Sequence, residues 1–245
     1  MSIIVNDSLK LIYLKNPKCA SEYMENILKT FYNFTQQSND FVNNIIKQEY
    51  IKNIVDNNFD ILNINENYDN YTFFSLVRNP YERFLSGFLY FYGSPFIIKD
   101  SKILDCYEGL SFNNYTRLDE FNISHLNSLD EAIQNKDNLY ENNIRAYGHL
   151  FIVQSSLLNS IKKEKIIKKM EELPNCLNEI FDKLKIDIIH EDYPKINDTM
   201  RYHNIYSYYT ENSIKFVNEY FNDDFINFGY NKFDNLEEMK LYYSE

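Results

Sequence analysis

Two short segments of this chain, far apart in the sequence, each place a cation and a hydroxyl between an apolar run and a helix-like stretch. They are Lys15–Ser21 (KNPKCAS) and Val77–Ser86 (VRNPYERFLS). Each pattern is typical of a strand that passes through a turn into the start of a helix. Helix N-termini offer unpaired N–H donors and the positive end of the helix dipole, so such turns bind phosphate-like groups. Two of them in one chain predict a ligand with anionic groups at both ends.

Hydrophobic spacing predicts the elements around these turns. Strands are expected at Leu9–Leu14, Phe59–Ile64 and Tyr71–Val77, and helices at 22–34, 80–92, 128–136, 156–173, 175–184 and 210–221, with a long loop at 186–209. Ser128 and Thr210 are the expected N-caps of their helices. Strands that alternate with helices argue for a parallel sheet covered by helices. We therefore expect one α/β domain over residues 1–245, with a helix-rich C-terminal half.

Charge and apolar content narrow the function classes. The formal net charge is −11, which argues against a general nucleic-acid binder, because phosphate neutralisation needs Lys and Arg. No run approaches the roughly 18 apolar residues of a membrane span, and residues 1–10 lack the apolar core of a signal peptide. Three widely spaced cysteines, Cys19, Cys106 and Cys176, predict reduced thiols. These features favour a cytoplasmic protein without a membrane span.

The residue types of the first turn suit an anion. Pro17 restricts the backbone and Lys18 supplies a flexible charge. Cys19 and Ala20 are small enough for backbone N–H groups to approach a ligand closely, and Ser21 adds a hydroxyl. A Walker A loop needs G-x-x-x-x-G-K-[ST], and this segment has no glycine. ATP or GTP hydrolysis therefore loses most of its support.

At this point the chain resembles a known family. Lys15–Ser21 looks like the 5′-phosphosulfate loop of sulfotransferases, particularly the membrane-type carbohydrate group and its soluble bacterial and viral relatives. Val77–Ser86 resembles the 3′-phosphate motif of that family, and Asp224–Tyr230 (DFINFGY) is similar to an ending common near the C-terminus of these enzymes. The resemblance implies a three-layer, P-loop-NTPase-like α/β fold with a central parallel sheet flanked by helices.

The resemblance also implies a sulfuryl donor, 3′-phosphoadenosine-5′-phosphosulfate (PAPS), with 3′,5′-adenosine diphosphate as its product and no metal. Lys18 would stabilise charge on the leaving phosphate. By the same resemblance, Arg78 and Ser86 would bind the 3′-phosphate. Ser86 lies two helical turns beyond Arg78 and so can face the same ligand. Arg201 resembles part of a late loop that closes over the nucleotide. The implied donor-binding residues are Lys15, Pro17, Lys18, Cys19, Ala20, Ser21, Glu22, Tyr23, Arg78, Ser86 and Arg201.

Transfer to a hydroxyl also needs a group that takes its proton. Relatives often carry a histidine or a carboxylate between the two motifs, and this chain has no histidine there. Asp56 lies at a similar position, with Asp60 and Glu66 as rivals. His149, followed by Gln154, is similar to a His-x-x-x-Gln element that lines the acceptor cleft in relatives, although the spacing is one residue longer. Asp56 and His149 therefore join Lys18 as catalytic candidates.

The resulting hypothesis is a PAPS-dependent sulfotransferase whose acceptor, by resemblance alone, is a carbohydrate. Two alternatives stay open: a small-molecule kinase of the P-loop type, and a nucleotide-binding module without catalytic activity. The missing glycines, and the lack of an obvious Mg²⁺-binding acid after a strand, argue against the kinase. The sequence leaves the oligomeric state open.

Overall fold

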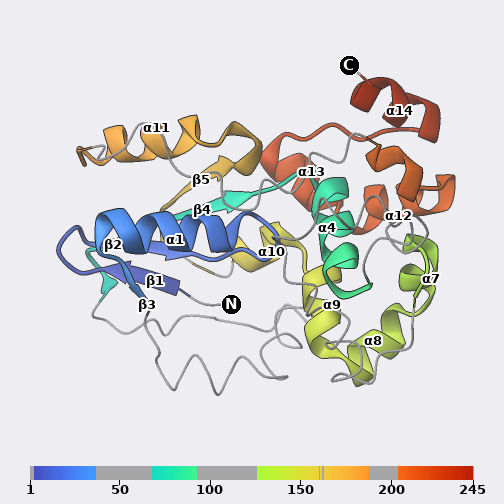
Figure 1. Cartoon of the computed structure of the whole chain (residues 1–245), viewed down its shortest axis with the longest axis horizontal. Helices are drawn as coiled ribbons and strands as arrows, with labels where there is room; N and C mark the ends of the chain where they lie inside the picture. Colours follow the sequence, from blue (N-terminus) through green and yellow to red (C-terminus); the bar gives the residue numbers. More distant parts are fainter. Residues whose placement is uncertain are drawn as a thin grey trace, which may run out of the picture.

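The computed structural model describes residues 3–36, 68–92, 126–159, 161, 163–187 and 204–244. Its centre is a five-stranded sheet in the order β3-β1-β2-β4-β5 (Figure 1). The strands are β1 (Ile3–Asn6), β2 (Leu11–Leu14), β3 (Thr35–Gln36), β4 (Thr72–Val77) and β5 (Lys165–Lys169). Strands β2, β4 and β5 are parallel neighbours, whereas β1 runs antiparallel to β2 and β3.

Helices cover both faces of the sheet. One face packs on α1 (Ser21–Tyr32) and α11 (Asn175–Lys183), and the other packs on α10 (Gln154–Asn159). Successive residues of β2 alternate between the two cores, because side chains along a strand point to opposite faces. This arrangement confirms the predicted three-layer α/β architecture.

A third core joins the remaining helices beside the sheet (Figure 1). It is built on α4 (Pro80–Tyr92), which follows β4 directly. The elements around it are α7 (Leu129–Gln134), α8 (Lys136–Asn142), α9 (Ile144–Phe151), η4 (Ile205–Tyr208), α12 (Glu211–Tyr220), α13 (Asn222–Phe228) and α14 (Leu236–Ser244). The helix-rich C-terminal half is therefore confirmed. None of the helices in the described ranges is long and apolar enough to cross a membrane.

Helix starts follow the predicted capping. The Ser128 hydroxyl accepts a hydrogen bond from the Glu131 N–H at 3.2 Å. Thr210 and Ser213 form a reciprocal capping box at the start of α12. Both helices begin where the sequence predicts, because a side-chain oxygen satisfies an N–H donor that lacks a partner within the helix.

One predicted helix is wrong. The stretch 156–173 was expected to be continuous, but α10 ends at Asn159 and Lys165–Lys169 forms β5, followed by the short helix η3 (Met170–Glu172). Every residue of β5 is partly exposed, and within the described part of the chain its one partner strand is β4. Its lysine-rich sequence suits an edge strand, which charged side chains protect from further pairing. Strand β1 was not predicted, and the predicted strand Phe59–Ile64 lies outside the described residues.

Candidate active site

The two motif turns leave the same edge of the sheet. Strands β2 and β4 are parallel, with Leu14 opposite Ser75, so the turns that follow them emerge side by side. Asn16 in the first turn donates its side-chain N–H to the Leu76 carbonyl at 3.0 Å. The structure thus brings together two segments that are sixty residues apart in the chain.

The first turn has an unusual backbone. Lys18 and Ala20 adopt left-handed conformations, with φ of 64° and 53°. Such conformations cost roughly 1–2 kcal/mol per non-glycine residue and occur most often at functional sites. The Ser21 hydroxyl donates to the Asn16 carbonyl at 2.6 Å, which holds the turn closed. Ala20 is the N-cap of α1 and its side chain makes no capping hydrogen bond. A helix N-terminus of this kind suits an anionic ligand, because its N–H groups point towards the ligand and the helix dipole favours negative charge.

Two cations lie next to each other at this edge. The Arg78 Nη1 donates to the Lys18 carbonyl at 3.4 Å, and the Lys18 Nζ lies 4.1 Å from the centre of the Tyr90 ring. Burial, followed by repulsion from Arg78, lowers the pKa of Lys18 to about 8. Anionic groups of a ligand would offset the desolvation of Lys18 and its repulsion by Arg78.

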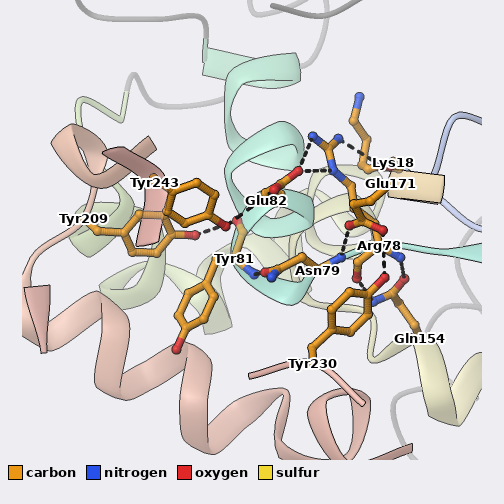
Figure 2. Close-up of polar contacts among 10 residues, drawn as sticks. All are labelled: Lys18, Arg78, Asn79, Tyr81, Glu82, Gln154, Glu171, Tyr209, Tyr230 and Tyr243. Carbon is orange, nitrogen blue, oxygen red and sulfur yellow. Dashed lines mark hydrogen bonds and ion pairs between the residues drawn. The ribbon is translucent and has the colours of Figure 1, made fainter. Parts of the chain in front are cut away.

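Helix α4 carries the residues that surround Arg78. Glu82 accepts hydrogen bonds from the Arg78 Nε at 3.3 Å and Nη2 at 3.2 Å (Figure 2). The Tyr243 hydroxyl, from α14, donates to the other oxygen of Glu82 at 3.4 Å. Ser86 and Tyr90 follow Glu82 at intervals of four residues and so lie on the same face of the helix. Ser86 is buried.

Two residues of the C-terminal motif, Asp224–Tyr230, support the second turn. The Asp224 carboxylate is fully buried and accepts the N–H groups of Gln154 at 3.0 Å and Ser155 at 2.6 Å, at the start of α10. The Tyr230 hydroxyl donates to Glu171 at 2.9 Å (Figure 2). Glu171 in turn accepts the Asn79 N–H at 2.7 Å, and burial raises the pKa of its carboxyl. The motif therefore acts on the turn indirectly.

Arg83, the second arginine of the VRNPYER segment, has a structural role. Arg83 is fully buried and donates to the carbonyls of His149 at 3.3 Å, Leu150 at 3.1 Å and Ile152 at 2.6 Å. These carbonyls lie in the last turn of α9 and at its C-cap, Ile152, where the backbone of a helix needs partners from outside it. Arg83 therefore fixes the end of α9, and with it the position of His149.

His149 lies close to the first turn. Its ring stacks on Tyr90, with centroids 5.2 Å apart and planes inclined by 8°. The same Tyr90 ring contacts the Lys18 Nζ, so a single aromatic ring lies against two of the three catalytic candidates, Lys18 and His149. Among the described residues, no cluster of three or more His, Cys, Asp or Glu side chains is arranged to bind a metal ion.

The remaining predicted residues of the first motif have different surroundings. Lys15 forms an ion pair with Glu25 of α1. Tyr23 packs against the core on the α1 side of the sheet, and burial raises its pKa. Glu22 is exposed at the first turn of α1, and Pro17 is partly buried in the turn itself. Burial raises the pKa of the Cys19 thiol to about 12, which keeps it protonated.

Two predicted site residues, Asp56 and Arg201, lie outside the described residues, as do Asp60 and Glu66. Sequence reasoning missed the supporting roles of Asn16, Glu82 and Glu171. Asn16 and Glu82 stand inside the two motifs and were therefore visible, but their partners lie far away in the sequence. Glu171 had no local signal, because its stretch was read as a helix.

We compared the chain with known proteins. The model of the sulfotransferase family matches residues 1–231. No curated protein matches significantly, and no solved structure does. The match includes both motif turns and the Asp224–Tyr230 segment, and it ends before α14.

Proposed function

Because the chain belongs to the sulfotransferase family, we propose that it transfers a sulfuryl group from PAPS to a hydroxyl group of a carbohydrate acceptor. The observation that carries the donor assignment is that the Arg78 guanidinium contacts the Lys18 backbone, so the two turns that bear these cations are adjacent. One cation at each turn matches a nucleotide with anionic groups at both ends. The family match supports sulfuryl transfer in general, and the carbohydrate acceptor rests on resemblance.

The residues of the two turns fit the donor. Arg78 offers a fork of N–H donors suited to a 3′-phosphate. Ser86 lies on the face of α4 that carries Glu82, the partner of Arg78. Glu82 accepts hydrogen bonds from two of these donors and so holds Arg78 in place. When the phosphate binds, these N–H groups would be shared between Glu82 and the phosphate, or would leave Glu82. Lys18 and the first N–H groups of α1 suit the 5′-phosphosulfate. Arg201 remains part of the proposed donor set.

Catalysis would depend on positioning and charge. Bound PAPS supplies the sulfuryl group and a phosphate as its leaving group. The Lys18 ammonium would stabilise the negative charge that develops on the leaving oxygen, and removal of one such donor typically costs about 10²–10³ in kcat. The ammonium must therefore be protonated during the reaction, although its pKa is lowered to about 8.

His149 is the better-supported candidate for the base that takes the acceptor proton. Its ring lies on Tyr90, which in turn contacts Lys18, so the imidazole is near the place where transfer would occur. A neutral imidazole can accept a proton at physiological pH. Asp56 stays a second candidate, without support from the described residues.

Calorimetry tests the donor assignment. The protein is titrated with 3′,5′-adenosine diphosphate, 5′-AMP and Mg-ATP, the first two without Mg²⁺. We expect 3′,5′-adenosine diphosphate to bind more tightly than 5′-AMP, and Arg78→Ala to remove that difference. Binding of Mg-ATP alone would contradict the proposal and favour a kinase. Transfer of labelled sulfate to a set of saccharides then tests the acceptor class.

A further inference from the structure

The side-chain amide of Gln154 contacts both motif turns at once. Its Oε1 accepts hydrogen bonds from Asn16 Nδ2 at 3.1 Å and Cys19 Sγ at 3.1 Å, in the first turn. The same oxygen accepts the backbone N–H of Arg78, in the second turn, at 2.9 Å. Its Nε2 donates to the Arg78 carbonyl at 2.8 Å and to the Asp224 carboxylate at 3.3 Å. The side chain of Gln154 is fully buried.

These partners permit only one orientation of the amide. Rotation by half a turn would set the NH₂ group against the Arg78 N–H, and the oxygen against the Arg78 carbonyl and Asp224. In the observed orientation both N–H groups of Gln154 are used. The side chain therefore has no donor left for a substrate, and its contacts are all within the protein.

We propose that Gln154 is a positioning residue that sets the separation between Lys18 and Arg78. The amide binds the backbone of Arg78 at two points, as a neighbouring strand would, and joins it to the first turn. The Asp224 carboxylate accepts hydrogen bonds from the backbone N–H and from the side-chain amide of Gln154, and so holds Gln154 in place. The inference rests on the proposed function, because the spacing of the turns matters only to a ligand that binds both.

The affinity of a ligand that binds both turns depends on the separation between Lys18 and Arg78. 5′-AMP and 3′-AMP each carry one phosphate and engage one turn, whereas 3′,5′-adenosine diphosphate engages both. In Gln154→Leu we expect the affinity for 3′,5′-adenosine diphosphate to fall by about tenfold or more, and that for each monophosphate by about threefold or less. Calorimetry with these three nucleotides measures the difference, at a temperature where both proteins are folded.

A second variant keeps the size of the side chain. Gln154→Glu loses the N–H donors at neutral pH, so its carboxylate faces the Arg78 carbonyl and the charge of Asp224. The other charged or titratable groups nearby include Arg83, Cys19, the Arg78 guanidinium and Glu171. Acidification to about pH 5.5 protonates the introduced carboxyl, which then donates an O–H to the Arg78 carbonyl. We expect the affinity of this variant for 3′,5′-adenosine diphosphate, relative to the unmutated protein at the same pH, to recover on acidification.

The control is Ile180→Ala in α11, which lowers stability by removing a fully buried apolar side chain but removes no side-chain hydrogen bond to either turn. It should leave the ratio of the three affinities unchanged. A purely structural role for Gln154 would weaken all three nucleotides equally, or none, and would show no recovery of Gln154→Glu at low pH. Either result overturns the inference. A wild-type protein that does not prefer 3′,5′-adenosine diphosphate overturns the donor assignment itself, before any substitution is made.

Discussion

The two cations of the site are held in different ways. Arg78 is fixed by Glu82 and by contacts to its backbone, whereas Lys18 stands on a left-handed turn and touches a ring. The sequence motifs identified both cations, because local composition places them in strand-to-helix turns. The partners that orient them could not be predicted, since Glu171 and Gln154 come from distant elements and only folding brings them close.

The pH dependence of kcat/KM should report the ionisation of the Lys18 side chain. Its pKa is lowered to about 8, so the charged fraction in the free enzyme falls as the pH rises through that value. Since the charged form is the active one, we expect kcat/KM to decline above about pH 8. Measurement from pH 6 to 10 in a coupled assay tests this expectation.

Two variants of Lys18 sharpen the test. Lys18→Arg keeps its charge throughout this range, so the alkaline decline should disappear even if the rate is lower. An unchanged decline in Lys18→Arg would assign it to another group. Lys18→Ala should lower kcat by about 10²–10³ while changing donor affinity much less.

Arg83 should matter for stability. Arg83→Met removes a buried guanidinium that donates to three carbonyls at the end of α9, so we expect the free energy of unfolding to fall by about 2–4 kcal/mol. Urea denaturation measures the loss. Lys215→Met removes an exposed cation from α12 and should change the same quantity by less than about 0.5 kcal/mol. Equal effects of the two changes would contradict the assigned role of Arg83.

At the scale of elements, α4 links the nucleotide turn to the helical core. Its start follows from Pro80, which suits the first turn of a helix, and its span is as predicted. Strand β5 shows the limit of such reasoning. Its isoleucines and lysines match a helical pattern as well as a strand, and only pairing with β4 decides between them.

The contact between α4 and α9 depends on Gly87. A Cβ at this position would lie 2.7 Å from the His149 carbonyl oxygen, which is backbone and cannot move away easily. At an ordinary position inside a helix, replacing glycine with alanine stabilises a protein by up to about 1 kcal/mol. Here we expect destabilisation of about 1–3 kcal/mol, measured by thermal and urea unfolding. A gain in stability would show that the two helices separate without cost.

The displacement of α9 by Gly87→Ala should also lower activity. His149 and Leu150 carry the atoms that the new methyl group would meet. A shift of the His149 backbone would move its ring relative to Tyr90. We expect kcat to decrease more than donor affinity, because Lys18 and Arg78 lie outside α4 and the residue that the new methyl group meets is His149.

At the scale of the whole molecule, the protein is acidic, yet it places two cations on adjacent turns at one edge of its sheet. Its net charge of −11 contrasts with the adjacent Lys18 and Arg78. The overall α/β class could be predicted from alternating strands and helices. The way in which the C-terminal helices return to the nucleotide turns could not, because Asp224 and Tyr230 act through residues distant in the chain.

Ligand binding should stabilise the whole fold. A nucleotide that binds both turns at 100 times its Kd adds about 2.7 kcal/mol to the free energy of unfolding. For a chain of this length, we expect 3′,5′-adenosine diphosphate to raise the Tm by about 5–11 °C in a thermal shift assay. Arg78→Ala at the same nucleotide concentration serves as the control. An equal rise in that variant would place the nucleotide elsewhere.

The contact between Tyr243 and Glu82 has a practical consequence. It places the last described helix, α14, one side chain away from the carboxylate that orients Arg78. Helix α14 also lies beyond residue 231, where the family match ends. A purification tag or dye attached after this helix would disturb the counter-ion of Arg78, so affinities measured on such fusions would describe an altered protein. An environment-sensitive dye at the same place would, for that reason, report nucleotide occupancy.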